Sequence, residues 1–392
     1  MWFCCRCGCG RFLCKRLLYA DLSVIFWLPV RSDTADIKRI LTDKIPLLDI
    51  RAPVEFQRGS VDGAVNVPLL DDKQRELIGK EYAQKGQDAA IALGLENATD
   101  DIKEARLSDW SAFIRQHPEG YLYCFRGGMR SSITQQWINE TGVQYPKVIG
   151  GYKAIRSYLL QRFEELSVAG NILVLSAPTG SGKTDLIREL SQSVDIEGLA
   201  KHRGSAFGGL FVDQPSQADW ENAVAARWLR LVENSDKPVM FESESHLIGR
   251  IALPSFFQEA LRGAPVVELI TDTADRIARI REDYVNTTMC AFKSEHSETE
   301  SYSRLESFIS DSLGRIQRRL GGEKYKKLNA LVPAAVNDLR TNSAPDTMNE
   351  IVLTLLHDYY DPLYAHKMIG REQQVVFSGT SEEIISWINA RE

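Results

Sequence analysis

The sequence predicts an α/β protein in which two units, each built on a parallel sheet, follow one another along the chain. Short apolar runs bounded by Gly or Pro alternate with longer, polar, helix-prone stretches, which is the pattern of strands joined by crossover helices. This alternation starts again near residue 168, and 392 residues are enough for two ordinary domains. We therefore expect an N-terminal extension at 1–30, a first α/β domain at 31–167, and a second at 168–392 that includes a C-terminal helical segment.

The elements of the first domain follow from its apolar runs and their terminators. Residues 63–68 (GAVNVP) end in a proline, which cannot donate to a sheet and so stops a strand. The full set of predicted elements is a strand at 46–50, a strand at 63–68, a polar helical stretch at about 72–116, a strand at 121–124, a helix at 131–140, a short strand near 147–149, and a helix from 152 to about 166. Residues 167–170 are interpreted as a linker.

In the second domain, apolar runs again alternate with amphipathic segments. Its predicted strands lie at 172–175, 210–212, 238–241, 266–270 and 375–377, with a helix at 184–192 after the first of them. The last helix opens at Thr380, and Glu383 stands three residues further on, which is the spacing of a capping box.

Composition limits the class of protein. The net charge of −6 argues against a protein that binds nucleic acid through bulk positive charge, so an RNA partner would need local basic patches. Five of the seven cysteines lie in the first fourteen residues, without the paired CxxC units of a zinc site. Because the rest of the chain has no disulfide framework, we expect a reducing compartment, the cytoplasm. The apolar run at 17–30 is too short to span a bilayer, so no membrane association is expected.

Residues 121–130 (YLYCFRGGMR) concentrate reactive side chains. Cys124 ends an apolar run, and a loop with two glycines and two arginines leads from it into a helix. A thiol close to helix N-terminal N–H groups and guanidinium groups reacts as a thiolate, and the same donors suit a tetrahedral anion. Cys124 is therefore the candidate nucleophile, with Arg126 and Arg130 as candidate anion ligands. The alternative is a buried cysteine that only ends a strand.

A second motif, APTGSGKT at 177–184, follows an apolar strand and opens a helix, which is the context of a phosphate-binding P-loop. Its glycines let the backbone wrap a phosphate, its lysine supplies charge, and the threonine hydroxyl can ligate Mg²⁺. Ala177 departs from the usual glycine at the first position. The predicted phosphate-binding residues are Gly180, Ser181, Gly182, Lys183 and Thr184, with Thr184 as the metal-binding side chain.

Two further groups of polar residues are candidates for the same site. Asp213, Glu242, Glu244 and Asp272 follow predicted strands, so some of them could serve a metal or act as an acid at the carboxyl edge of the sheet. The alternative for each is a solvated group or a helix cap. The loop KHRGSAFG at 201–208 has an anion-binding composition, with His202, Arg203 and Ser205 as candidate phosphate contacts, or it is a solvated connector.

A basic cluster lies at 315–327, where six cations face a single glutamate. It is either a solvated helix face or a patch that contacts the RNA backbone. The candidate tRNA-binding residues are Arg315, Arg318, Arg319, Lys324, Lys326 and Lys327.

The first domain resembles a rhodanese module. The resemblance is carried by LDIR at 48–51, EF at 55–56, GAVNVP at 63–68, the Cys124 loop, and the two glycines at 150–151 before the last helix. Cys124 to Arg130 has the Cys-x5-Arg length of rhodanese-fold phosphatases, in which a longer loop accommodates a larger anion. Against a phosphatase, Tyr123 stands where those enzymes place histidine, and no general-acid aspartate is apparent.

The combination of this domain with a P-loop domain resembles the tRNA 2-selenouridine synthase family. The resemblance covers about residues 36–370 and includes the two motifs above, HRGSAFG at 202–208, QPSQ at 214–217, ESES at 242–245 with IG at 248–249, and YYDPLY at 359–364. His246 departs from the arginine expected after Glu-Ser, so a phosphate contact there would use a weaker cation.

The resemblance implies a transferase that replaces the sulfur of wobble 2-thiouridine in tRNA with selenium from selenophosphate. It also implies transfer of a geranyl group from geranyl diphosphate to that sulfur, with the S-geranyl nucleoside as the intermediate that selenium displaces. Lys183 and Thr184 would bind the diphosphate, with Mg²⁺. Cys124 would deliver or activate selenium while Arg126 and Arg130 hold the selenophosphate anion. The implied partners are tRNA and an enzyme that supplies selenophosphate.

Three other interpretations remain open at the level of sequence. One is a rhodanese-fused P-loop NTPase or kinase that acts in general tRNA thiolation, which steady ATP or GTP turnover would favour. Another is a non-catalytic sensor, although such a protein would be expected to lack the loop cysteine. The third is a rhodanese-fold phosphatase, which would hydrolyse a generic aryl phosphate.

Overall fold

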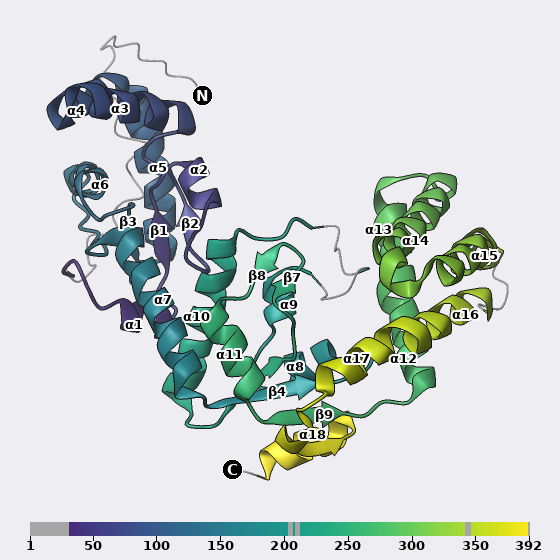
Figure 1. The fold of residues 1–392 in the computed structure, drawn as a ribbon. Coiled ribbons are helices and arrows are strands. Elements are labelled where there is room, and N and C mark those ends of the chain that lie inside the picture. The colour runs from purple at the N-terminus through teal and green to yellow at the C-terminus, as the bar shows by residue number, and fades with distance from the viewer. Residues whose placement is uncertain (1–30, 203–206, 208–211, 342–345, 391–392) are drawn as a thin grey trace, which may run out of the picture. The chain divides into compact units, whose positions relative to one another are not determined.

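The computed structural model describes residues 31–202, 207, 212–341 and 346–390 (Figure 1). The chain divides into two compact units, of which the first ends at Tyr158 and the second begins at Leu159. The N-terminal extension and residues 210 and 211 of one predicted strand lie outside the described residues. Each unit has its own parallel sheet, so the predicted α/β class with two parallel-sheet units is confirmed.

In unit 1 a small parallel sheet is surrounded by helices. Its strands, in the order β2-β1-β3, are β1 (Leu47–Asp49), β2 (Val65–Asn66) and β3 (Tyr121–Tyr123). The helices are α1 (Ile37–Thr42), α2 (Pro53–Gln57), α3 (Asp72–Lys85), α4 (Gln87–Asn97), α5 (Asp100–Gln116), α6 (Met129–Glu140) and α7 (Gly151–Ala169), which continues into unit 2. The predicted strand near 147–149 is reduced to single bridges from Lys147 to Leu122 and from Val148 to Thr34.

The carboxyl end of β1 is fixed by a buried ion pair. Arg51 Nη2 lies 2.6 Å from Asp49 Oδ2, both side chains are almost fully buried, and the guanidinium lies 3.9 Å from the ring centroid of Tyr152. Arg51 also donates to the carbonyl of Gly59. Separating the two partners would leave a buried charge without compensation, which is unfavourable. The pair therefore keeps the loops around the end of the sheet in one arrangement.

The predicted linker at 167–170 is wrong for its first three residues, which belong to α7. Ser167 is buried and its hydroxyl donates to the carbonyl of Phe163 one turn earlier, so a serine that often favours turns is accommodated inside the helix. The helix ends only before Gly170, whose φ of +70° lies in the left-handed region that favours glycine.

Unit 2 contains a parallel sheet with the strand order β10-β9-β4-β6-β5. Its strands are β4 (Ile172–Ser176), β5 (Ser193–Val194), β6 (Val239–Glu242), β9 (Val266–Leu269) and β10 (Val375–Gly379), and a separate antiparallel pair is formed by β7 (Leu247–Ile248) and β8 (Ile251–Ala252). Figure 1 shows β4 and β9 side by side. Every residue of β4 is buried, as expected for a central strand covered on both faces.

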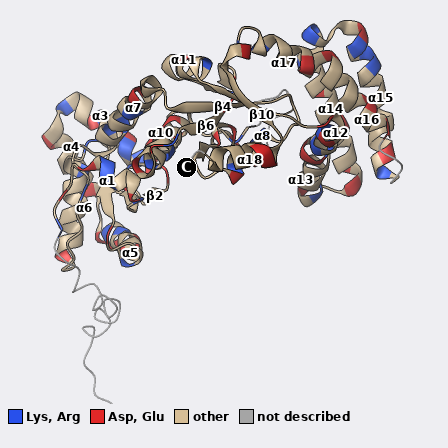
Figure 2. Ribbon diagram, turned by 90° about the horizontal axis from the view of Figure 1, so that it is seen from below, with Lys and Arg blue, Asp and Glu red and all other residues tan. Residues whose placement is uncertain are grey.

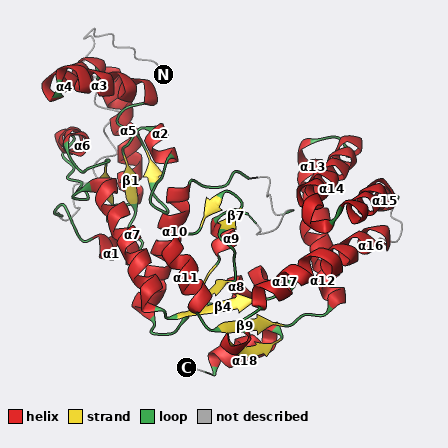
Figure 3. Cartoon of the chain, viewed as in Figure 1, coloured by secondary structure: helices red, strands yellow, loops and turns green. Residues whose placement is uncertain are grey.

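π-Helical segments at Glu282–Asn286 and Leu356–Tyr360 each follow an α-helix of unit 2. Most of the other described residues of unit 2 outside its strands belong to α-helices. These helices are α8 (Lys183–Glu189), α9 (Ile196–Leu199), α10 (Gln217–Asn234), α11 (Ser255–Gly263), α12 (Thr273–Arg281), α13 (Thr287–Glu295), α14 (Glu298–Leu320), α15 (Gly322–Arg340), α16 (Asp346–Leu355), α17 (Asp361–Met368) and α18 (Ser381–Asn389). The described residues between β9 and β10 form helices and turns without a strand (Figure 3). Thr380 caps α18 with Glu383 in the predicted capping box. Within the described parts of the chain, none of these helices has both the length and the apolarity needed to cross a bilayer.

Candidate functional site

Cys124 follows β3 directly, and its side chain is only 3% exposed. Both of its backbone groups are held in place. Its N–H donates to the buried hydroxyl of Ser131 at 3.1 Å, and its carbonyl accepts from the N–H of Tyr152 at 2.9 Å. The thiol forms no disulfide with another described residue. The strand, α6 and α7 therefore all fix the position of this cysteine.

The loop after Cys124 closes tightly on the start of α7, and two glycines allow this. A Cβ at Gly127 would lie 2.8 Å from the N of Gly150, and a Cβ at Gly151 would lie 2.3 Å from the carbonyl oxygen of Cys124. Both glycines have positive φ values, +67° and +57°. Among the described residues, the backbone N–H groups of 125–130 find no hydrogen-bond acceptor, so a row of donors remains for an anion.

The structure separates the two arginines of this loop. Arg130 forms a two-pronged ion pair with Glu55 of α2, with Nη1 to Oε2 at 2.6 Å and Nη2 to Oε1 at 3.1 Å. Burial works against the charged form of Arg130, but the hydrogen bonds and charge of Glu55 outweigh it and raise the pKa of Arg130. Arg126 is exposed. Both arginines line the same pocket as Cys124. Arg130 is thus a pre-oriented cation, whereas Arg126 is free to reach for an anion.

Glu55→Gln is expected to lower the free energy of unfolding at neutral pH by about 1–3 kcal/mol, because Arg130 loses its charged partner. Burial opposes ionisation of Glu55, yet the hydrogen bonds of Arg130 lower the pKa of Glu55 below its ordinary value of 4.5. The pair therefore stabilises the fold above that pH, and the stabilisation is lost as the pH falls through the lower, folded-state pKa. Calorimetric melting of both proteins between about pH 7 and about pH 3 should show the difference shrinking toward the acid end.

The control for this prediction is Glu76→Gln. Glu76 also pairs with a cation, Lys80 at 2.6 Å, but both side chains are more than 60% exposed. Solvent-exposed pairs contribute little, so its melting curve should match that of the unchanged protein. An equal loss of stability in the two variants would contradict the structural role given to Glu55.

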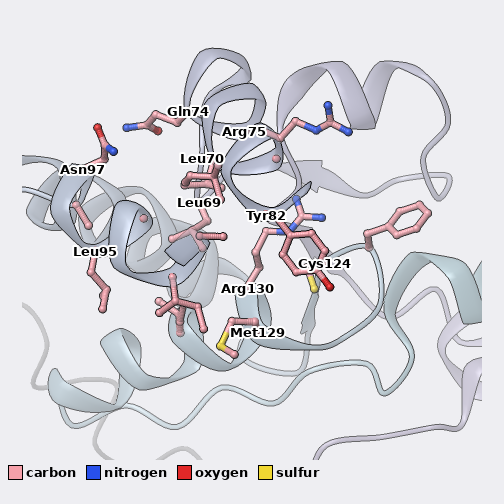
Figure 4. A pocket seen from close by; sticks show the side chains of 18 of the residues that line it. Leu69, Leu70, Gln74, Arg75, Tyr82, Leu95, Asn97, Cys124, Met129 and Arg130 are labelled. Carbon is pink, nitrogen blue, oxygen red and sulfur yellow. The ribbon is translucent and has the colours of Figure 1, made fainter. Parts of the chain in front are cut away.

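A pocket of about 980 Å³ opens beside Cys124, within unit 1. Figure 4 shows Cys124 next to Arg130 at one end, with Leu69, Leu70 and Leu95 toward the other. Most of the lining is apolar and comes from α3, α4 and α6 together with the segment before α3. The apolar residues that line it are Leu69, Leu70, Ile78, Tyr82, Ala83, Ala90, Ile91, Leu95, Ala98, Ile102, Phe125, Met129, Ile133 and Trp137.

In unit 2 the predicted P-loop joins β4 to α8. Gly180 and Gly182 have φ values of +82° and +87°. A Cβ on either would come within 2.7 Å of a side chain of α12, so these positions require glycine. Lys183 Nζ donates to the carbonyl of Ala177 at 3.0 Å, and the hydroxyl of Ser181 is buried with no partner among the described residues. The loop has the backbone form and the donors of a phosphate site.

Sequence reasoning missed two arginines of α12 that support this loop. Arg276 donates to the carbonyl of Thr179 at 2.9 Å and forms a two-pronged pair with Asp361. Arg279 reaches the carbonyl of Gly180 at 3.3 Å. The sequence indicated one part of this arrangement, because Asp361, the partner of Arg276, lies in the YYDPLY motif. An arginine pair three residues apart on a helix, however, resembles an ordinary solvated face.

The carboxylates at the edge of the sheet gather beside the P-loop. Pairing of Leu175 with Glu242 places Glu242 next to the P-loop strand. One oxygen of Glu242 accepts from the N–H of Ile196, and the other is buried without a partner among the described residues. Burial and the charge of Glu197 raise the pKa of Glu242, and burial with Glu197 raises the pKa of Glu244 to about 8. Like charges crowd this edge.

These oxygen atoms fit a magnesium ion that also binds phosphate. The Thr184 hydroxyl donates to Glu197 at 3.5 Å, and the partnerless oxygen of Glu242 belongs to the same cluster. No group of three or more His, Cys, Asp or Glu side chains in the described residues is arranged to hold a metal alone. Mg²⁺ usually takes one or two protein oxygens together with phosphate and water, which this set allows.

The structure brings three of the sequence motifs together and leaves other candidates apart. A Cβ on Gly249 would lie 2.3 Å from Gln214 and 2.7 Å from His202, so these three residues pack closely. The amide of Gln214 donates to the carbonyls of Ala200 and Ile248. The remaining predicted residues of this region are Arg203 and Ser205, which lie outside the described residues, and Asp213, His246 and Asp272, which are exposed.

A small apolar cavity of about 50 Å³ begins at Thr179 of the P-loop. Its walls include side chains of α12, α14 and α16 and of the π-helical segments Glu282–Asn286 and Leu356–Tyr360, which follow α12 and α16. Among the described residues, the lining contains no charged group. Its residues are Thr179, Phe207, Ile280, Tyr284, Val285, Ile309, Met348, Ile351, Val352, Leu355, Leu356 and Tyr360. An apolar chain attached to a P-loop ligand would find apolar partners here.

The six basic candidates are exposed on α14 and α15, around the turn at Gly321 and Gly322 (Figure 2). Two of them are paired. Lys324 contacts Asp358 at 2.9 Å and Lys327 contacts Glu350 at 3.3 Å. Arg318, Arg319 and Lys326 show no ion pair to the described residues, so the cluster retains positive charge for an external partner.

Comparison with known proteins agrees with both units. A family model described as the tRNA 2-selenouridine synthase AAA domain matches residues 170–392, and a rhodanese-like domain matches 33–158. The proteins named tRNA 2-selenouridine synthase from Marinobacter nauticus and Bordetella petrii are 40% and 41% identical to this chain. The matches cover 92% of this chain and 98% and 96% of those proteins. The protein of the same name from Shewanella frigidimarina is 39% identical over 90% of this chain and 96% of its own length. The predicted rhodanese and P-loop architecture is thus confirmed, and the chain belongs to the tRNA 2-selenouridine synthase family.

Proposed function

We propose that this protein is a tRNA-modifying transferase that replaces the sulfur of wobble 2-thiouridine with selenium from selenophosphate. The observation that carries this proposal is the presence in one chain of both reactive sites in intact form. Cys124 and Arg130 lie on one pocket of unit 1, and the P-loop of unit 2 has its lysine, threonine and neighbouring carboxylates. A relative that had lost the chemistry would be expected to lack one of these groups.

The reaction is proposed to run in two steps because a thiocarbonyl sulfur is a poor leaving group. In the first step, the sulfur attacks C1 of geranyl diphosphate, the carbon–oxygen bond breaks, and diphosphate leaves. In the second, selenium adds to C2 and geranylthiol departs. Alkylation turns the sulfur into a group that leaves as a thiolate, and neither step is a redox reaction.

The first step is placed at the P-loop of unit 2. The loop N–H groups and Lys183 are suited to hold the diphosphate, and Thr184 with Glu242 would hold Mg²⁺. When bound, Mg²⁺ neutralises charge that develops on the leaving diphosphate. The apolar side chains described around the cavity beside Thr179 favour a prenyl donor over a nucleotide, since a base and ribose need polar partners. Its present volume is smaller than a geranyl chain, so its side chains must rotate to admit one.

The second step is assigned to Cys124. The thiolate could attack selenophosphate at selenium, to carry selenium itself, or at phosphorus, to release selenium, and electron balance favours attack at phosphorus. Thiolate attack at selenium would expel trivalent phosphite. Attack at phosphorus instead forms a sulfur–phosphorus bond, breaks the selenium–phosphorus bond and releases HSe⁻. Water then hydrolyses the phosphocysteine to phosphate, which regenerates the thiolate. The Cys-x5-Arg spacing and the free loop N–H groups suit a phosphoryl group, with Arg130 fixed by Glu55.

The basic turn between α14 and α15 is proposed to contact the tRNA backbone, and the selenophosphate-producing enzyme is a proposed partner for supply of the co-substrate. Because the chain carries a net charge of −6, such a local patch is the expected means of holding RNA.

Nucleoside mass spectrometry of tRNA from a strain lacking this gene tests the proposal. We expect 2-selenouridine to be absent and 2-thiouridine to accumulate, with recovery when the gene is restored. Normal 2-selenouridine in the deletion strain would refute the function. Purified protein that turns over ATP or GTP steadily, and does not bind geranyl diphosphate, would favour an NTPase instead.

A further inference from the structure

The pocket beside Cys124 is larger and more apolar than selenium transfer alone requires. At about 980 Å³ it lies near the top of the range for pockets that enclose drug-sized ligands, whereas selenophosphate is a small, highly charged ion. Polar and charged groups gather around Cys124, in the form of Arg126, Arg130 and Glu55. Along α3 and α4 the wall combines aliphatic side chains, Leu95 among them, with polar and charged ones (Figure 4). The latter are Gln74, Arg75, Glu76, Lys80, Gln87 and Asn97.

Several of the lining side chains are exposed in the free protein. Tyr82, Leu95 and Met129 are 58%, 56% and 46% exposed. An apolar surface of this kind beside a nucleophile indicates a ligand that carries an apolar group. Such a group covers the apolar side chains, and removing their surface from water is favourable. The unmodified nucleobase and the selenophosphate ion are both polar, so neither one accounts for the apolar side chains of this lining.

We propose that this pocket binds the geranyl chain of the S-geranyl nucleoside during selenium transfer. The inference rests on the proposed function, which supplies a ten-carbon chain attached to the sulfur that selenium replaces. The chain would run along α3 and α4 from the Cys124 end toward Leu95, and C2 of the base would lie beside Cys124. The pocket thereby distinguishes the S-geranyl acceptor from the unmodified 2-thiouridine.

The bonds that change at this site balance without a co-reactant. HSe⁻ released from phosphorus forms a bond to C2, and the C2–S bond breaks with its electron pair on sulfur. The selenol proton passes to geranylthiolate, so geranylthiol and the anion of 2-selenouridine result, and the anion takes a proton from solvent. Geranylthiol is apolar, so the pocket also holds the leaving group until it departs.

Gly94 offers a way to fill the pocket without straining the fold. It lies in α4, lines the pocket, and a Cβ there would meet only Ile78 Cδ1, at an ordinary 3.5 Å. Gly94→Trp is therefore expected to fold and to occupy the space meant for the chain. Leu95→Gln is a second variant, whose altered side chain is already more than half exposed. Gly263→Trp in α11, where a Cβ meets nothing within 4 Å, is the matched control outside the pocket.

The experiment uses the full chain, selenophosphate, and anticodon stem-loop RNA bearing S-methyl, S-dimethylallyl or S-geranyl 2-thiouridine. These substrates release aliphatic thiols of similar basicity. We expect kcat/KM of the unchanged protein to rise with chain length, by at least about tenfold from methyl to geranyl. Gly94→Trp should abolish this ranking and Leu95→Gln should weaken it, whereas Gly263→Trp should retain it. Geranylation of 2-thiouridine RNA should stay the same in all variants.

The outcomes distinguish failure of the proposed function from failure of the pocket assignment. If the unchanged protein selenates none of the S-alkyl RNAs, the proposed function is wrong. If it selenates S-geranyl RNA without regard to chain length, or if Gly94→Trp keeps the ranking, the chain is bound elsewhere and only the pocket assignment fails. Loss of geranylation in Gly94→Trp would place the donor, rather than the intermediate, in this pocket.

Discussion

Cys124→Ser is expected to lower formation of 2-selenouridine by about 10³-fold or more while geranylation of 2-thiouridine continues. A serine hydroxyl stays protonated where a thiol supplies thiolate, so attack on the phosphorus of selenophosphate stops. The P-loop lies in the other unit and is unchanged. Mass spectrometry of nucleosides from treated tRNA should therefore show the S-geranyl nucleoside in place of 2-selenouridine.

Cys290→Ser is the control, because Cys290 is the other cysteine among the described residues and is exposed. It should behave as the unchanged protein does. Acid-quenched protein that has met selenophosphate alone should carry one phosphoryl group on Cys124, detectable by peptide mass analysis, and the Cys124→Ser variant should carry none. Full selenation by the serine variant would remove Cys124 from the reaction.

Lys183→Ala is expected to stop the pathway one step earlier. Removing a charge that stabilises the departing diphosphate should reduce geranylation by about 10²-fold or more, so 2-thiouridine accumulates. Geranylation is measured with geranyl diphosphate and 2-thiouridine RNA, and product is followed as the S-geranyl nucleoside. Lys293→Ala, which alters an exposed lysine paired with Glu298, is the control and should leave the rate unchanged.

The same variant gives a second test. RNA that already carries the S-geranyl group should bypass the defect, and Lys183→Ala should then convert it to 2-selenouridine at the normal rate. Failure to convert it would mean that the P-loop also takes part in selenium transfer. Normal geranylation by Lys183→Ala would show that the diphosphate is held elsewhere.

Both reactive motifs could be located from sequence because each is local. The Cys124 loop is a strand, a glycine-rich turn and a helix within twenty residues, and the P-loop is the same arrangement with different side chains. In each, the chemistry depends on residues that are adjacent in the chain. It also depends on glycines with positive φ, a backbone conformation that other residues rarely adopt. The structure places β3 and α6, and β4 and α8, where these signals indicate.

The partners of these motifs could not be found in the same way, because they are brought together by the fold. Glu55 lies 75 residues before Arg130, and Asp361 lies 85 residues after Arg276. A lone glutamate or arginine on a helix has no local feature that distinguishes an ion pair from a solvated group. The linker predicted at 167–170 failed for a related reason, since tertiary packing around α7 overrides the weak local preference of Ser167.

The position of Cys124 at one end of the pocket has a consequence for selenium toxicity. Hydrogen selenide that escaped into solution would meet oxygen and be oxidised to elemental selenium. Within unit 1, the thiol that would release hydrogen selenide and the side chains that would bind its acceptor line the same pocket. When the acceptor is bound, hydrogen selenide would then be consumed in the same pocket in which it is released.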